Sequence, residues 1–309
     1  MKDFESQIAT YLKFCQNRKN LNPKTVKAYR IDLAQFSQFA KDRIKEPIKD
    51  IISDYISYLH NCFKPKTVKR KIATIKAFFN HLEYEEIIEQ NPFVKIRTKF
   101  KEPFTLPKTI PLNVIQAILD SAYTELQQKT TSDFQYKTVQ RDIAVLELLF
   151  ATGVRVSELC SLTIKDVDIN NKFIKIYGKG SKERLIQLGN SDVILALENY
   201  ANAFKKQTNE SGYFFVNKLN NRLSEQSIRF MIKKHVQKCN ISIHITPHMF
   251  RHSFATLLLE EDVDIRYIQK LLGHSSIVTT QIYTHVTSRK QMHILTTKHP
   301  RNKLLVNKG

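Results

Sequence analysis

Apolar residues recur at helical spacing along most of the chain, and only one stretch departs from that period. Residues 3–17, 23–39 and 65–82 each place their apolar side chains three or four positions apart. Residues 166–188 instead alternate, turn at Asn170-Asn171, alternate again and turn at Gly178-Lys179-Gly180. The pattern predicts a mainly α protein with one small antiparallel β-sheet made of two hairpins.

A cluster of prolines divides this helical chain into two parts. Pro92, Pro103, Pro107 and Pro111 surround a segment with no clean period, which is typical of a linker. At 309 residues the chain is long enough for two domains. We expect a four-helix domain over 1–95, a linker over 96–110 and a second domain over 111–309.

Helix start signals place the elements within each domain. The first domain is predicted to have helices over 3–17, from Asn22-Pro23, over about 48–60 and from Lys64-Pro65. Helices of the second domain are predicted over 112–128, 138–151, 155–162, 191–205, 224–239, 247–260, 264–272, 276–284 and 288–297. The polar stretch 124–138 is predicted to extend the loop between two of them.

The positive charge of the chain is concentrated in acid-free stretches. Lys and Arg number 49 against 29 Asp and Glu, a formal charge of +20, and residues 6–31 and 64–82 hold no acid. Such a surplus is typical of a protein whose partner is a polyanion. On the predicted helices, the basic side chains opposite the apolar stripes are Lys24, Lys27, Arg30, Lys66, Lys69 and Arg70. We predict that they bind the backbone of duplex DNA; the alternative is a solvated face, where acids normally alternate with bases.

Other classes of protein find little support in the sequence. The apolar stretches are too short to span a membrane, and the first residues lack the apolar region of a secretion signal. The four cysteines are far apart and form no CxxC pair, so neither a zinc knuckle nor a disulfide framework is indicated. We therefore expect a cytoplasmic, nucleoid-associated protein with reduced thiols.

Four short segments of the second domain carry residues suited to chemistry. They are ATGVRVSELCSL, GKGSKERL, ITPHMFRHSFAT and LLGHSSIVTTQIYTHV. Taken singly, each has an ordinary explanation: Arg155 pairs with Glu158 along a helix, Lys179 occupies a solvated turn, and Tyr283 is half-buried packing. No Walker A loop is present.

The third segment has the features of a phosphate site. Thr246 is a good N-cap and Pro247 a good first helical residue, which place His248 and Arg251 on one face of the first turns. A metal site is the competing interpretation, because His244, His248 and His252 are evenly spaced. It is disfavoured, because Pro247 starts a new helix between the first two and the HExxH pattern is absent.

Together, the four segments make the sequence closely resemble the tyrosine recombinase (phage integrase) family, and its shorter bacterial Xer-type members best. The resemblance covers nearly the whole chain. In the first domain, TVKAYRIDLAQF and TVKRKIATIKAFFNHL are similar to the family's core-binding domain. The resemblance implies an N-terminal four-helix core-binding (SAM-like) domain and a mostly helical catalytic domain with the small sheet. The polar stretch 124–138 is longer than in the simplest members, and its role stays open.

The resemblance also implies an activity and its residues. The active-site cluster would be Arg155, Lys179, His248, Arg251 and His274, with Tyr283 as the nucleophile. In this family the tyrosine attacks the scissile phosphate of duplex DNA, leaves a 3′-phosphotyrosyl link, and exchange proceeds through a Holliday junction. Two arginines suit the charge on the non-bridging oxygens, and a covalent link that conserves phosphodiester energy requires neither ATP nor metal. We therefore expect no cofactor.

Partners and biological role follow from the same resemblance. A tetramer on DNA with short inverted repeats is expected, joined through the C-terminal segment, with a partner recombinase as a further possibility. The basic helix faces of the first domain would grip the duplex opposite the catalytic domain. The sequence does not distinguish between two biological roles: integration, excision or inversion of a mobile element, and resolution of chromosome or plasmid dimers. The alternatives are a catalytically silent DNA-binding accessory factor and a topoisomerase-like nicking-closing enzyme.

Overall fold

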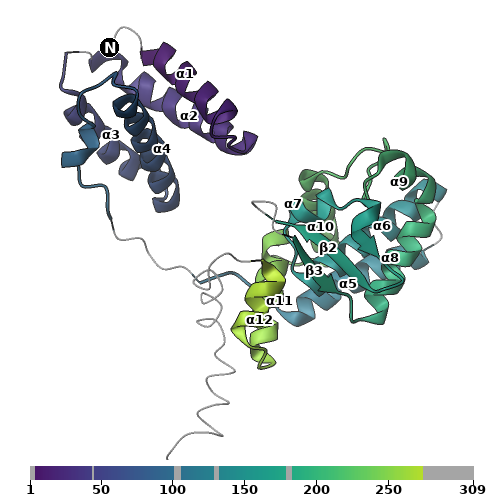
Figure 1. The fold of residues 1–309 in the computed structure, drawn as a ribbon. Helices are drawn as coiled ribbons and strands as arrows, with labels where there is room; N and C mark the ends of the chain where they lie inside the picture. The colour runs from purple at the N-terminus through teal and green to yellow at the C-terminus, as the bar shows by residue number, and fades with distance from the viewer. Residues whose placement is uncertain (1–3, 44, 101–105, 129–131, 179–182, 274–309) are drawn as a thin grey trace, which may run out of the picture. The chain divides into compact units, whose positions relative to one another are not determined.

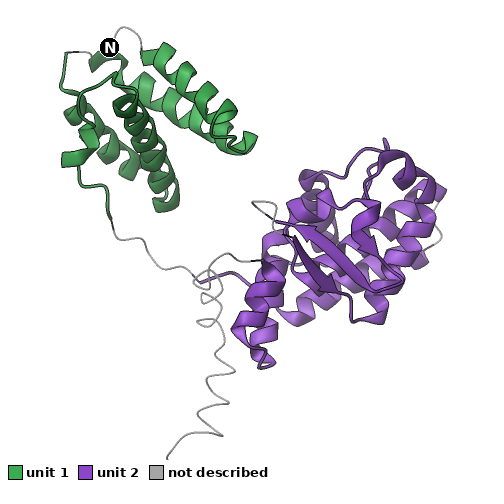
Figure 2. Cartoon of the chain, viewed as in Figure 1, with its two compact units in different colours: residues 1–104 green, residues 105–309 purple. Residues whose placement is uncertain are grey.

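The computed structural model describes residues 4–43, 45–100, 106–128, 132–178 and 183–273. The chain folds into two compact units, the first ending at Phe104 and the second beginning at Thr105 (Figure 2). Within the described residues, no helix is long and apolar enough to cross a membrane. Each unit is built around its own hydrophobic core.

Four helices form the first unit, as predicted (Figure 1). They are α1 (Phe4–Asn17), α2 (Pro23–Ala40), α3 (Ile48–Cys62) and α4 (Pro65–Tyr84), with short 3₁₀ turns at Lys41–Arg43 and Pro92–Lys95. The predicted start signals are present: the Asn22 side chain accepts a hydrogen bond from the Lys24 backbone N–H, and Pro23 and Pro65 open their helices. The sequence pattern therefore predicted the order of the helices in this unit and where they begin.

Aromatic side chains fill the core between these helices. The rings of Phe36 and Tyr55 lie 5.1 Å apart, and those of Tyr11 and Phe78 lie 5.4 Å apart. All four side chains are almost completely buried. Burial of such large rings is the main contribution to the stability of a four-helix unit of this size.

The second unit combines eight α-helices with one small sheet in its described part. The helices are α5 (Leu112–Gln127), α6 (Asp133–Thr152), α7 (Val156–Ser161), α8 (Ser191–Ala203), α9 (Lys205–Ser211), α10 (Glu225–Lys238), α11 (Pro247–Glu260) and α12 (Ile265–Leu272). A 3₁₀ turn at Ile164–Asp166 leads into strands β1 (Val167–Asp168), β2 (Phe173–Tyr177) and β3 (Glu183–Gln187). They form one antiparallel sheet in the order β1-β2-β3, which confirms the predicted sheet.

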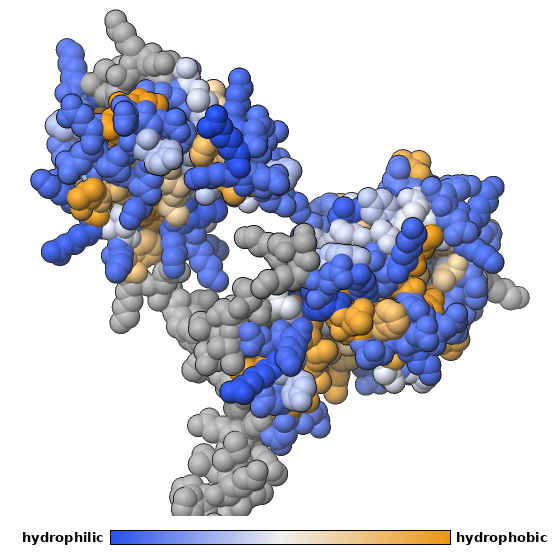
Figure 3. Space-filling model, in the orientation of Figure 1, coloured by the Kyte–Doolittle hydropathy of each residue, from blue (hydrophilic) through white to orange (hydrophobic). Residues whose placement is uncertain are grey.

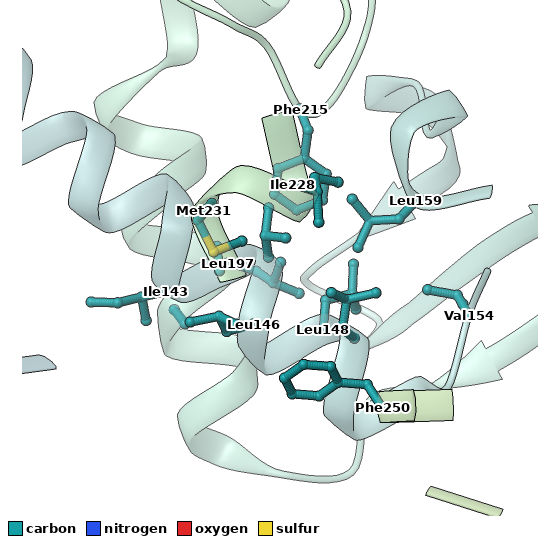
Figure 4. Close-up of a cluster of buried hydrophobic side chains, with 14 of the residues drawn as sticks. Ile143, Leu146, Leu148, Val154, Leu159, Leu197, Phe215, Ile228, Met231 and Phe250 are labelled. Atoms are coloured by element: carbon teal, nitrogen blue, oxygen red, sulfur yellow. The ribbon is translucent and has the colours of Figure 1, made fainter. Parts of the chain in front are cut away.

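Helix α6 is the centre of this unit. It packs against α5, α8, α10 and α11, and every residue from Ile143 to Leu149 is buried. Leu146 and Leu148 project from it into a cluster with Phe250 of α11 and Phe215 (Figure 4). Because α6 is covered on so many sides, its C-terminal end at Thr152 is held at a defined position beside α11.

Two predictions for the second unit were wrong. The stretch 124–138 is not a long loop. Helix α5 ends at Gln127, in agreement with the helix predicted over 112–128, but α6 begins at Asp133 and not at 138, and the Ser132 side chain accepts a hydrogen bond from the Gln135 backbone N–H. The missed first turns of α6, DFQYKT, contain no apolar stripe, so periodicity could not reveal them. Helix α9 was missed for the same reason, since KKQTNES is polar throughout.

Candidate active site

The first predicted site residue, Arg155, lies just after a sharp turn at the end of α6. Gly153 ends that helix with a left-handed φ of +58°, and a Cβ at this position would lie 2.6 Å from Cδ1 of Phe254. Only glycine fits there without displacing the phenyl ring. Arg155 then forms the N-cap of α7, and its side chain is 39% exposed. The turn therefore directs Arg155 away from the core.

The second pair of predicted site residues lies on α11. Thr246 occupies the N-cap and Pro247 opens the helix, as predicted, although the Thr246 side chain makes no capping hydrogen bond. His248 is exposed, whereas Arg251 is only 1% exposed. The Arg251 guanidinium donates to the carbonyl oxygens of Gly153 at 2.8 Å and Leu272 at 2.6 Å. These two hydrogen bonds fix the plane of a charged group that has little access to water.

Three of the predicted site residues line one cavity of about 300 Å³. Arg155, His248 and Arg251 all line it, although Arg155 is far from the other two in sequence. Its remaining lining residues are Val154, Val156, Ser157, Arg229, Thr246 and Pro247. Because the cavity lies at the N-terminal end of α11 and is lined by three arginines, it is suited to a phosphate group.

A buried carboxylate organises the arginines beside this cavity. Glu158 accepts hydrogen bonds from the backbone and guanidinium of Arg155 and from both terminal nitrogens of Arg184. Burial by itself would raise the pKa of Glu158, but the hydrogen bonds from Arg184 and Arg155 outweigh it and hold the pKa below its ordinary value. The carboxylate therefore stays charged and orients both arginines.

Three predicted site residues, Lys179, His274 and Tyr283, lie outside the described residues. In sequence, Lys179 falls between β2 and β3, and His274 follows Gly273, the residue that ends α12. The structure thus brings together Arg155, His248 and Arg251, and the positions of the other three stay predictions.

The described residues give no support to a metal site at His244, His248 and His252. There, no group of three or more His, Cys, Asp or Glu side chains is arranged to hold a metal ion. The rings of His248 and His252 are 4.4 Å apart in an edge-to-face arrangement.

Two arginines near the cavity were not singled out from the sequence. Arg229, from α10, lines the cavity and pairs with Glu225 at 3.1 Å. No sequence signal marks it, because it lies in an ordinary amphipathic helix. Arg184 belongs to the quoted segment GKGSKERL, so attention to every basic residue of that segment, and not only to Lys179, would have found it.

The predicted DNA-binding residues lie on two helices that pack against each other. Lys24, Lys27 and Arg30 are exposed on α2, and Lys66, Lys69 and Arg70 are exposed on α4. Hydrophilic residues cover most of the visible surface of the first unit (Figure 3). These helices therefore present their basic residues to solvent as predicted, and DNA binding by them stays a prediction.

A buried ion-pair network joins these two helices. Asp32 of α2 is fully buried and pairs with Lys71 at 3.0 Å and with Arg70. The Thr74 hydroxyl donates to the same carboxylate at 3.2 Å. Arg70 thus contributes to an internal contact while 45% of its side chain stays exposed beside the other five basic residues.

Models of two domain families match the chain. The phage integrase family matches residues 108–290, and the SAM-like N-terminal domain of phage integrases matches residues 8–86. The two matches correspond to the two compact units.

Named relatives match over nearly the full length. A tyrosine recombinase of Agathobacter rectalis is 51% identical, covering 97% of this chain and 98% of the relative. The tyrosine recombinase XerC of Oceanobacillus iheyensis is 35% identical, with 97% and 98% covered. XerD of Staphylococcus saprophyticus is 37% identical, with 95% and 98% covered.

Solved structures agree with these relatives. XerA recombinase is 26% identical, with a TM-score of 0.54 and 96% and 99% of the two chains covered. XerH recombinase, bound to a palindromic difH substrate after cleavage, shares the fold with a TM-score of 0.75 at 21% identity, covering 94% of this chain and 84% of that one. The chain therefore belongs to the phage integrase family and is a tyrosine recombinase, an enzyme of site-specific DNA recombination.

Proposed function

We propose that Tyr283 is the nucleophile of this recombinase and that Arg155, Lys179, His248, Arg251 and His274 form its active-site cluster. The observation that carries this proposal is the cavity at the start of α11, where Arg155, His248 and Arg251 meet. These residues come from two motifs far apart in sequence. Their convergence is expected if both motifs serve one phosphate, and it has no explanation from the ordinary structural role of either motif alone.

The two arginines stabilise the charge that develops on the non-bridging oxygens during phosphoryl transfer. A guanidinium remains charged at any physiological pH and donates in a plane that matches two phosphate oxygens. Glu158 holds Arg155, and the Gly153 and Leu272 carbonyls hold Arg251, so neither guanidinium must reorganise as the reaction proceeds.

Proton transfers complete the reaction. A tyrosine phenol has a pKa near 10 and is mostly protonated at neutral pH, so the attacking oxygen needs a base. His248 lines the cavity, which supports its choice as that base. Lys179 protonates the departing 5′-oxygen and His274 donates to a phosphate oxygen. The 3′-phosphotyrosyl link retains the phosphodiester energy, and a 5′-hydroxyl of another strand reverses the step without ATP.

The basic helices of the first unit and the C-terminal segment supply the remaining contacts. The exposed residues of α2 and α4 bind the phosphate backbone of each half-site. The apolar residues of the C-terminal segment pack onto a neighbouring protomer and join a tetramer on short inverted repeats; they are Met292, Ile294, Leu295, Leu304, Leu305 and Val306. Strand exchange between two such sites is the reaction needed both for movement of a mobile element and for resolution of chromosome or plasmid dimers.

A suicide substrate tests the proposal. A nicked duplex carrying the ends of the encoding element, or the dimer-resolution site of the host, is incubated with wild type and with Tyr283→Phe in buffer without metal or ATP. We expect an SDS-resistant protein–DNA adduct with wild type alone. Arg155→Gln should bind the duplex and form little adduct.

The outcomes separate the competing functions. Tight, specific binding without an adduct, even when a partner recombinase from the same host is added, would favour the accessory-factor role. Adduct formation and relaxation of supercoiled DNA without any recombinant product would favour a nicking-closing enzyme. An adduct that persists in Tyr283→Phe would refute the choice of nucleophile.

A further inference from the structure

We propose that Arg184 is a positioning residue that joins three parts of the active site: strand β3, which follows Lys179 in sequence, Arg155 and the end of α12. The proposal rests on the function proposed above, because it takes Arg155, Lys179 and the residues after α12 as the reacting site. Arg184 lies in β3, directly after the segment that contains Lys179. Its side chain leaves the sheet and contacts two other elements.

The first contact is a two-pronged ion pair with Glu158 of α7. Nη2 of Arg184 lies 2.7 Å from Oε2 of Glu158, and Nη1 lies 3.2 Å from Oε1. Both side chains are largely sequestered, with 12% of Arg184 and 6% of Glu158 exposed. A two-pronged pair removed from water fixes the plane of the carboxylate as well as its position.

The same carboxylate holds Arg155. Its Oε1 accepts from Nη1 of Arg155 at 2.8 Å, and its Oε2 accepts from the Arg155 backbone N–H at 2.9 Å. Glu158 therefore lies between Arg155, which lines the phosphate cavity, and Arg184, which does not. Any shift of Arg184 is transmitted to the cavity through Glu158.

The second contact is with the C-terminal end of α12. The final carbonyls of a helix lack partners within it, and here Nε of Arg184 donates to the Leu271 carbonyl at 2.9 Å. The next carbonyl, that of Leu272, accepts from Arg251. Arg184 also packs so closely on Gly273 that a Cβ there would lie 2.8 Å from its Nη1. Two arginines from different elements thus hold consecutive carbonyls, immediately before His274.

These contacts use the specific shape of arginine. Nε points to Leu271 while the two terminal nitrogens point to Glu158, so one rigid plane fixes the distance between α7 and α12. A lysine carries the same charge on one rotating nitrogen and lacks this fork. Charge alone therefore does not reproduce the arrangement, which gives the proposal a sharp test.

The experiment measures single-turnover cleavage of the suicide substrate by Arg184→Lys and Arg184→Gln at saturating enzyme. Affinity for uncut duplex is measured separately in the Tyr283→Phe background. We expect affinities within about twofold of wild type and a cleavage rate lower by about 100-fold for Arg184→Gln, the size of effect that misplacement by an ångström produces. Arg184→Lys should remain at least about tenfold slow, because it restores charge without the fork.

Arg141→Gln is the matched control for loss of stability. Arg141 is 14% exposed, pairs with buried Asp142 at 3.1 Å and donates to the Val216 backbone carbonyl at 3.3 Å, so its environment resembles that of Arg184. It lies on α6 and does not line the phosphate cavity. We expect Arg141→Gln to lower the melting temperature as much as Arg184→Gln does and to cleave at the wild-type rate.

A double variant supplies a second readout. If Arg184 acts through Glu158, then Arg184→Gln/Glu158→Gln should cleave no more slowly than the slower single variant. Wild-type cleavage by Arg184→Lys, or equal losses in Arg184→Gln and Arg141→Gln, would overturn the positioning role. Absence of any adduct with wild-type protein would instead count against the proposed function itself.

Discussion

Arg251 donates a hydrogen bond of 2.6 Å to the carbonyl oxygen of Leu272, the last residue of α12. The same guanidinium donates to the Gly153 carbonyl, two residues before Arg155. One buried side chain of α11 is therefore bonded to the turn that presents Arg155 and to the end of the helix that precedes His274. Arg251 therefore has two effects on the proposed site: it supplies positive charge, and it holds two segments of the site in place.

Replacing Arg251 with lysine tests that dependence. A lysine ammonium keeps the charge but cannot reach both carbonyls in one plane. We expect cleavage of the suicide substrate to fall by about 10²–10³-fold, as when a preorganised donor is removed. Stability should fall by about 1–3 kcal/mol, because a buried carbonyl loses its donor. Arg222→Lys, an exposed change in the same unit, is the control and should leave both quantities near wild type.

Removing the charge of Asp32 should destabilise the first unit. Lys71 is only 2% exposed and depends on Asp32 for its countercharge. Asp32→Asn leaves that ammonium buried without an anion, which costs about 3–5 kcal/mol. Urea unfolding followed by circular dichroism measures the loss, and hydrogen exchange in α2 and α4 locates it.

A pair of companion variants checks this explanation. Asp54→Asn breaks the exposed pair with Arg43 in the same unit and should cost less than about 1 kcal/mol. Asp32→Asn combined with Lys71→Met should recover much of the missing stability. If the double variant is no more stable than Asp32→Asn, the unpaired ammonium is not the cause.

His235 should make the second unit sensitive to acid. It is fully buried on α10, and neither ring nitrogen has a hydrogen-bond partner among the described residues. Burial lowers the pKa of His235 to about 4, partly opposed by the charge of Glu125. In the unfolded chain the pKa returns to about 6.5. Below that pH the unfolded state takes up a proton that the folded state does not, so stability is lost as the pH falls toward 4.

The measurement compares the free energy of unfolding at several pH values. His235→Leu removes the proton uptake, so its stability should fall less than that of wild type between pH 6.5 and 4, by about 1–3 kcal/mol. His244→Gln removes an exposed histidine and should follow the wild-type curve. Parallel curves for wild type and His235→Leu would show that this histidine is not responsible.

The basic helices should give the enzyme a steep salt dependence. A variant with Lys24, Lys27, Lys66 and Lys69 all changed to Gln leaves Arg70 to its pair with Asp32 and so spares the core. We expect weaker binding, and a slope of log affinity against log salt that is smaller by about 0.9 for each DNA phosphate that is no longer neutralised. Lys205→Gln/Lys206→Gln alters two exposed lysines of α9 and should leave the slope unchanged. An unchanged slope in the quadruple variant would place the DNA contacts elsewhere.

Much of this architecture was determined locally and was therefore readable in the sequence. Helical periodicity and the Asn22-Pro23 and Lys64-Pro65 signals located the helices of the first unit, and alternation located the sheet. Thr246-Pro247 marked the start of α11, because the preference of proline for the first helical position depends on neighbouring residues alone. Where helices lack an apolar stripe, as at α9 and the start of α6, the same reasoning had no signal to use.

Tertiary structure alone decided which residues meet. A periodic pattern shows which face of a helix is buried, but it does not show which element covers that face. Nothing near Arg251 in sequence indicates that its partners are Gly153 and Leu272, and Glu158, expected to pair with Arg155, also binds Arg184. No local pattern shows that Asp32 faces Arg70 across the helix interface, and DNA binding by Arg70 stays a prediction. These contacts join distant segments, so they exist only once the chain has folded.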